Sequence, residues 1–156
     1  MAASARSRRI YMDSSVWIAL LAQEASAERL TQWLDDEKGQ LFTALWTRTE
    51  LASALSIKAR RGEFSQKQVV QLLLEFEQWV ATGVQLLNID NRDFAHAAGL
   101  CAKVKAKLRS GDALHLAVAL RHQMTHVATL DQDMRQNALE MGLQVLKYDD
   151  HKKPSR

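Results

Sequence analysis

The sequence predicts an α/β fold, with a mainly parallel central sheet between two layers of helices in a three-layer α/β/α arrangement. Two observations predict it. Short apolar runs of strand length alternate with longer segments in which apolar residues recur every three or four positions, and strands that alternate with helices are typical of parallel sheets. In addition, 156 residues is the length of one domain. We expect a single domain over residues 1–148 and a disordered basic tail over residues 149–156.

The first strand is expected at residues 10–12, where a short apolar run stops at Asp13. Ser14 or Ser15 is a candidate cap for the helix that follows, because a side-chain hydroxyl accepts hydrogen bonds from the free N–H groups of a first helical turn. Asp13 therefore lies at the carboxyl end of a strand, where open α/β sheets place their ligand sites. We expect its carboxylate to be solvated, rigidly held and available to a metal ion.

The later elements are predicted in the same way, from short apolar runs of strand length and from segments in which apolar residues recur every three or four positions. We expect strands at residues 41–43, 84–89, 126–129 and 143–148, and helices at about 25–37, 46–61, 65–83, 93–108, from 110 onward, and through 139. In the helix over 65–83, Val70 and Leu74 make the apolar stripe wider than one core face requires. Two interpretations stay open: a helix buried between layers, or a groove for a second copy or another partner.

The composition is that of an ordinary globular protein, with 47% apolar and 25% charged residues. No apolar run approaches the roughly 20 residues of a membrane span, and the first residues lack the apolar stretch of a signal peptide. Cys101 is the single cysteine, so no intrachain disulfide can form. We expect a cytoplasmic protein with no membrane association.

The net charge is only +3, but Lys and Arg gather at residues 6–9, 58–61, 103–109 and 152–156. A solvated face is the plainer interpretation of any one cluster. Several clusters beside an acidic pocket would suit a phosphate backbone.

Four acidic residues stand apart from those on exposed helix faces. Asp13 and Asp131 follow strands, Asp112 lies in a first helical turn, and Glu50 lies near the start of the helix after the second strand. In a parallel sheet these positions fall at one edge, so the four can converge. The helix dipole alone would explain Asp112. It does not explain a convergent set, because two carboxylates about 4 Å apart repel by roughly 4 kcal/mol at an effective dielectric near 20.

A convergent set of carboxylates needs a counter-charge, and oxygen donors without a Cys or His pattern favour Mg²⁺, with Mn²⁺ as the alternative. Such a site suits phosphodiester hydrolysis by metal-activated water. Asp13 and Asp112 are the first candidates as ligands, and Glu50 and Asp131 complete the set or orient water. Asp133 is an alternative to Asp131 or assists it, because the Asp-Gln-Asp spacing leaves the choice open.

Four segments, residues 12–20, 47–55, 111–119 and 128–134, resemble the four acidic motifs of the PIN-domain family and occur in the family's order. The resemblance covers about residues 9–148, and the size is similar to that of VapC-type toxins of type II toxin–antitoxin systems. It implies a metal-dependent endoribonuclease with an RNA substrate and a cognate antitoxin protein as partners. Members are usually homodimers.

Position by position, Asp13, Glu50, Asp112 and Asp131 match the acidic quartet of the family. Ser15 resembles the small polar residue that often supports the first acid, and Thr129 resembles the hydroxyl residue before the last. Met134 departs from the pattern, because members often carry an aromatic residue there.

Two further side chains have both a structural and a functional interpretation. His115, three positions after Asp112, could reach the site as a base, although a packed or exposed histidine is the plainer interpretation. Trp46 is the tryptophan best placed for stacking on a base, since it is near Glu50, although core packing is the plainer interpretation.

Two other classes of function compete with a nuclease. One is a non-catalytic PIN-fold module that binds RNA or protein. The other is a receiver-type signalling domain, which needs a phosphate-pairing Lys after a late strand, where this chain has Thr129, Leu130 and Asp131.

Overall fold

The computed structural model describes residues 8–146, and the expected tail over residues 149–156 lies outside the described residues. Within residues 8–146 the strands form one parallel sheet in the order β3-β2-β1-β4-β5. The strands are β1 (Arg9–Met12), β2 (Gln40–Ala44), β3 (Gln85–Leu87), β4 (His126–Ala128) and β5 (Gln144–Val145). The predicted parallel sheet is confirmed.

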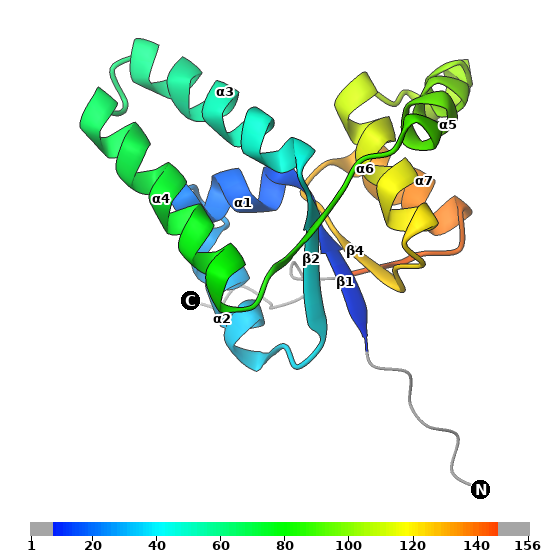
Figure 1. Cartoon of the computed structure of the whole chain (residues 1–156), viewed down its shortest axis with the longest axis horizontal. Coiled ribbons are helices and arrows are strands. Elements are labelled where there is room, and N and C mark those ends of the chain that lie inside the picture. The colour runs from blue at the N-terminus through cyan, green and yellow to red at the C-terminus, as the bar shows by residue number, and fades with distance from the viewer. Residues whose placement is uncertain (1–7, 147–156) are drawn as a thin grey trace, which may run out of the picture.

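The helices form a layer on each side of this sheet (Figure 1). On one side lie α1 (Ser14–Leu21), α2 (Ala27–Asp36), α3 (Trp46–Arg60) and α4 (Gln66–Thr82), and on the other lie α5 (Asn91–Cys101), the short 3-10 helix η1 (Val104–Ala106), α6 (Ser110–Arg121) and α7 (Gln132–Glu140). The predicted three-layer α/β/α architecture is therefore confirmed. Among the described helices, none combines the length and the apolar character needed to cross a membrane.

β1 is the central strand of the sheet. A central strand is covered on both faces, and the side chains of β1 are apolar enough to be buried there. Ile10, Tyr11 and Met12 are all fully buried. Successive side chains of a strand point to opposite faces, so Ile10 and Met12 enter the core under α1, α2 and α4, while Tyr11 enters the core under α5, α6 and α7. The hydroxyl of Tyr11 is thereby delivered to the interior of the second layer.

Each layer has its own apolar anchor. Trp17 of α1 packs edge-on against Phe76 and Trp79 of α4, with ring centroids 5.1 and 5.9 Å apart, and such pairs contribute about 0.5–1.5 kcal/mol beyond burial. In the other layer α6 is the central helix, because every side chain from Ala113 to Ala119 is buried. Helix α6 is therefore buried around its whole circumference over these residues.

The expected helix over residues 93–108 is wrong in its second half. Helix α5 ends at Cys101, and the chain continues through η1 and a left-handed Lys107 (φ 55°). Val104, expected on the core face, is 89% exposed. The side-chain amide of Asn137 in α7 donates a hydrogen bond to Ala106 O (2.8 Å), so a tertiary contact fixes an irregular path that local helix propensity did not predict.

The wide apolar stripe of α4 is not buried between layers. Val70 and Leu74 are 47% and 58% exposed, and they line a surface hollow of about 270 Å³ between α3 and α4. The first of the two interpretations of this helix is therefore wrong, and the interpretation as a partner groove stays a prediction.

An ion pair joins the start of α5 to the end of α6. Arg121 donates to both carboxylate oxygens of the buried Asp93 (2.6 and 2.7 Å), and Asp93 also accepts from the backbone N–H of Asp90 (2.8 Å). Burial raises the pKa of Asp93, but the hydrogen bonds from Arg121 and Asp90 outweigh it and hold the pKa below its usual value.

We predict that Arg121→Met lowers the free energy of unfolding by roughly 2–4 kcal/mol, because it leaves a buried carboxylate without its partner. The folded pKa of Asp93 is depressed, so this contribution is present above the unfolded pKa of about 3.9 and is lost as the pH falls through the lower folded pKa. Urea unfolding near neutral pH measures the cost. The control is Arg92→Met, whose pair with Asp90 is exposed to solvent and should therefore cost much less to remove. Equal costs for the two variants would contradict the prediction.

Candidate active site

The four predicted acids lie at the carboxyl edge of the sheet. Asp13 directly follows β1, Asp131 comes three residues after the end of the neighbouring strand β4, and the two act as the N-caps of α1 and α7. Asp112 lies in the first turn of α6, and Glu50 lies in α3, which follows β2. Because β2, β1 and β4 are adjacent and parallel, their following segments meet at one end of the molecule (Figure 1).

Asp13 is the structural centre of this edge. Its carboxylate accepts hydrogen bonds from Val16 N (3.2 Å), from the hydroxyl of Ser15 (2.5 Å) and from the hydroxyl of Thr129 (2.5 Å). The side chain that caps α1 is therefore that of Asp13 and not that of Ser14 or Ser15, because the Asp13 carboxylate accepts the hydrogen bond from the free N–H of Val16. The expected solvated carboxylate is also wrong, since Asp13 is only 2% exposed.

Burial raises the pKa of Asp13, and the charge of His115 and the hydrogen bonds from Ser15, Thr129 and Val16 only partly offset the shift. The Ser15 hydroxyl, which donates to Asp13, also accepts from the backbone N–H of Leu130 (2.9 Å). These contacts lock the loop after β4 to the loop after β1. Ser15 and Thr129, the two hydroxyl residues named by the family resemblance, thus both contact Asp13.

Asp112 and Asp131 lie on either side of one guanidinium group. Arg109 Nε is 3.6 Å from Asp112 Oδ2, and Arg109 Nη2 is 3.5 Å from Asp131 Oδ2. Burial and then the charge of Asp131 raise the pKa of Asp112 to about 6, with a further increase from Asp13, although Arg109 opposes the shift. The ionised form of Asp112 is therefore disfavoured first by burial and then by the neighbouring charge of Asp131.

Asp131 rather than Asp133 faces this cluster. Asp131 accepts a hydrogen bond from Met134 N (2.7 Å) and lies near enough to perturb Asp112. Asp133 is exposed in the first turn of α7 and lines a separate hollow beside Lys103 and Lys105.

The side chain of Glu50 contacts His115, for which the sequence favoured a structural interpretation. Its carboxylate is hydrogen-bonded to Nε2 of His115, which is 1% exposed, and Nδ1 of the same ring is 2.6 Å from the hydroxyl of Tyr11. The signal for His115 was its position one helical turn after Asp112 on α6, which places both side chains toward the same edge. No sequence signal pointed to Tyr11, because a tyrosine in a buried strand is ordinary core composition.

The hydrogen-bond chain fixes the roles of these three groups. Burial and then the charges of Asp13 and Glu50 raise the pKa of Tyr11 well above its usual value, so Tyr11 keeps its proton. The carboxylate of Glu50 can only accept, so Nε2 of His115 carries a proton that is directed at Glu50. Burial raises the pKa of Glu50, but the hydrogen bond and charge of His115 outweigh burial and hold the pKa below its usual value.

The donor chemistry of this edge fits a hard divalent cation, because all four acids supply oxygen and their charge is only partly balanced. Within residues 8–146, however, no three Asp, Glu, His or Cys side chains are already arranged as a set of metal ligands. The reason is that the acids have protein partners: hydroxyl groups hold Asp13, His115 holds Glu50, and Arg109 lies between Asp112 and Asp131. Arg109 is the easiest partner to displace, because its side chain is 82% exposed and its ion-pair distances are long.

Comparisons with known proteins identify the family of this chain. The family model described as PIN domain matches residues 10–140. Two curated relatives from Mycobacterium tuberculosis cover most of the chain. Ribonuclease VapC46 of strain H37Rv is 31% identical over 139 residues, 88% of this chain and 95% of that protein. Ribonuclease VapC47 of strain CDC 1551 is 29% identical over 136 residues, 85% of this chain and 92% of that protein.

Solved structures show the same fold. The crystal structure of M. tuberculosis VapC20, described as a sarcin-ricin loop cleaving toxin, has a TM-score of 0.66 and 17% identity, over 82% of this chain and 94% of that chain. A toxin–antitoxin complex from Klebsiella pneumoniae has a TM-score of 0.60 and 19% identity, over 89% of this chain and 97% of the matched chain.

The raised pKa of Asp112 predicts how stability depends on pH. Its folded pKa of about 6 lies above the unfolded value of about 3.9, so its contribution to stability is full at low pH and is lost as the pH rises from about 4 to above 6. We predict that Asp112→Asn, which cannot ionise, is more stable than the wild type at pH 7.5 by roughly 1–2 kcal/mol, a value reduced for partial solvation. Urea unfolding at pH 7.5 and at pH 5 checks this. A difference between the two proteins that is the same at both pH values would contradict the prediction.

Proposed function

This chain belongs to the PIN domain family, and on that premise we propose that it is a metal-dependent endoribonuclease that acts as the toxin of a toxin–antitoxin pair. The reaction is hydrolysis of RNA phosphodiester bonds by an activated water molecule. The observation that carries the proposal is the convergence of acids at one edge of the sheet, where Asp13 ends up beside the loop after β4 and Asp112 and Asp131 lie on either side of the Arg109 guanidinium. Both curated relatives are named ribonucleases.

Asp13 and Asp112 are the proposed principal ligands of the metal ion, and Glu50 and Asp131 complete the site. When bound, a divalent cation neutralises charge on the phosphate and makes a water molecule more acidic. The fixed position of Asp13 supports its role, because three donors orient its oxygens and such outer contacts hold ligands in place. Mg²⁺ is the proposed ion and Mn²⁺ the alternative, because both prefer oxygen donors.

Glu50 is the proposed acceptor for a proton of the attacking water. The contact with His115 keeps Glu50 ionised and fixes its carboxylate at the acidic edge. His115 is a positioning residue in this scheme, since it acts through Glu50, and the contact with Tyr11 holds its ring in place. Asp133 has no part in the reaction.

The proposed partners are an RNA substrate, a cognate antitoxin protein and a second copy of the chain, in the cytoplasm. An antitoxin is supported by the matched toxin–antitoxin complex. The alternative function is a PIN-fold module that binds RNA or protein without cleavage. One observation favours it, namely that the acids already have protein partners in place of a preformed set of metal ligands among the described residues.

Cleavage of total cellular RNA by the purified protein separates the two functions. We predict discrete fragments with Mg²⁺, none with EDTA, and a loss of at least about 100-fold in rate for Asp112→Asn, because a metal ligand is removed. In a bacterial host, Asp13→Asn is expected to relieve growth arrest. Intact RNA despite Mg²⁺ binding, with the antitoxin absent from the preparation, would favour the binding module, as would arrest that persists with a folded Asp13→Asn protein.

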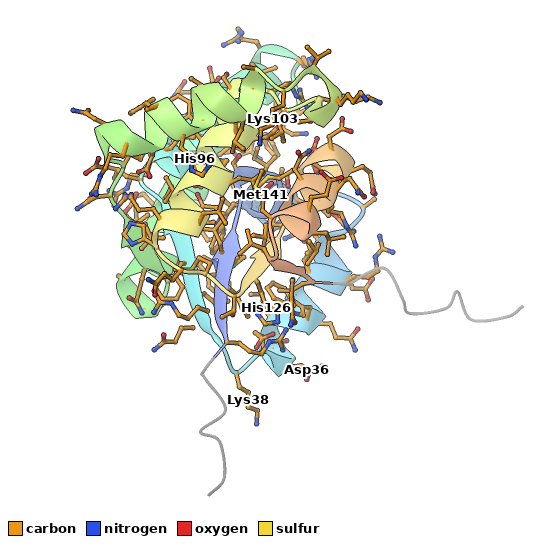
Figure 2. The ribbon with its side chains drawn as sticks, turned by 90° about the vertical axis from the view of Figure 1, so that its right-hand side faces the viewer. Asp36, Lys38, His96, Lys103, His126 and Met141 are labelled. Atoms are coloured by element: carbon orange, nitrogen blue, oxygen red, sulfur yellow. The ribbon has the colours of Figure 1, made fainter. Side chains whose placement is uncertain are left out.

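The positioning role of His115 has its own test. We predict that His115→Gln lowers kcat by roughly 10–100-fold and leaves KM for RNA nearly unchanged, because it disorders Glu50 without touching substrate. The matched control is His96→Gln, which replaces a histidine exposed on α5 (Figure 2) and should retain wild-type kcat. Steady-state cleavage of one RNA by both variants gives the comparison. An unchanged kcat in a folded His115→Gln protein would remove His115 from the scheme.

A further inference from the structure

A surface pocket of about 440 Å³ lies beside the acidic edge, in a place that the proposed reaction does not use. It is formed where the first residue of α3 approaches α5 and the start of α6. Its walls carry two aromatic side chains, Trp46 and Phe94, with the small side chains Ala97 and Ala98 between the aromatic faces and the helix backbone. Phe94 is 55% exposed, so a large aromatic surface faces solvent here.

The pocket and the acidic edge share a wall. Gly111 lines the pocket, and a Cβ atom on Gly111 would lie 2.7 Å from Glu50 Oε1 and 3.7 Å from Trp46 Nε1. Trp46 Nε1 and Glu50 Oε1 therefore both lie close to Gly111, and the Trp46 side chain lines the pocket. Any group that enters the pocket lies next to the carboxylate that we propose holds the attacking water.

A cationic segment begins and ends at the wall of the pocket. Cys101 and Ser110 both line the pocket, and the segment that joins them carries Lys103, Lys105, Lys107 and Arg109. The three lysines line a neighbouring hollow with Asp133 and Glu140 of α7, and Arg109 directly precedes the pocket residue Ser110. Lys103 lies at the end of the molecule opposite His126 and Lys38, which mark the amino ends of β4 and β2 (Figure 2). The cationic segment is thus on the same edge as the acids, and Arg109 reaches Asp112 and Asp131.

An apolar aromatic pocket, a cationic segment that begins and ends at its wall, and an adjoining carboxylate site match the parts of a nucleotide. We propose that the pocket binds one unpaired base of the RNA substrate next to the phosphate that is cleaved, by stacking against Trp46 and Phe94, while the cationic segment contacts the flanking phosphates. The inference rests on the proposed function, because it assigns a base-binding subsite to that same active site. Phe94 would then be a residue that determines which base is tolerated beside the cut.

The test uses a short single-stranded RNA that spans a mapped cleavage site, together with versions in which one nucleotide at a time is abasic. For the wild type, we expect one abasic position to lower kcat/KM about tenfold, equivalent to about 1.4 kcal/mol. Phe94→Ala and the pocket-filling Ala98→Trp should lower kcat/KM for the intact RNA by a similar factor and should be insensitive to the abasic change at that position. Leu139→Ala, also 55% exposed but on α7, is the matched control and should behave as wild type.

Binding of labelled RNA in EDTA keeps this test separate from the test of catalysis. If no RNA is cleaved, a mixed-sequence oligoribonucleotide is used, and Phe94→Ala but not Leu139→Ala should weaken its binding several-fold. Absent cleavage with this binding pattern would overturn the nuclease and leave the base pocket standing. Cleavage and binding that are both indifferent to Phe94→Ala and Ala98→Trp would overturn the pocket and leave the nuclease standing. If these variants instead impaired only inhibition by an antitoxin, the pocket would be a protein-docking site, and the inference would be wrong.

Discussion

The site depends on a single buried carboxylate and the donors that surround it. Asp13 follows the central strand β1, and its carboxylate caps α1 by accepting a hydrogen bond from Val16 N. The same carboxylate accepts hydrogen bonds from the hydroxyl groups of Ser15 and of Thr129, which follows β4. A buried acid without such donors would cost several kcal/mol, so the loops after β1 and β4 are tied into one position. Asp131 lies two residues after Thr129, so the contact between Thr129 and Asp13 also fixes where Asp131 lies. Two strands far apart in sequence thereby place their acids at a common edge.

The same edge is electrostatically unfavourable in the isolated protein. Burial and mutual repulsion raise the pKa of Asp112, and Arg109, on an exposed side chain, balances the charge only in part. Active sites commonly retain destabilising charge of this kind because that charge binds the ligand or metal ion on which function depends. Rigid contacts surround this edge. His115 is held in the interior by hydrogen bonds to Tyr11 and Glu50, and it lies on α6, whose side chains are buried around it.

The sequence predicted the order of elements and the acids well, because both depend on local patterns: strand-length apolar runs, helical periods and acids that follow strands. It failed where tertiary contacts decide. The hydrogen bond from Asn137 to Ala106 O ends the expected helix early, and the solvation of Asp13 was misjudged because its buried donors come from another strand. His115 was passed over for the same reason. Its partners Tyr11 and Glu50 are 104 and 65 positions away, and a single sequence does not record such pairs.

The long separations also govern when the site can exist during synthesis. Asp13 meets Thr129 across 116 positions, and Ser15 meets Leu130 across 115. A chain emerging from the ribosome carries its first acid early, yet it has no β4 to complete the edge until residues 126–128 have been made. Contacts of such high sequence separation form late. The acidic edge is therefore incomplete in any nascent chain that still lacks β4.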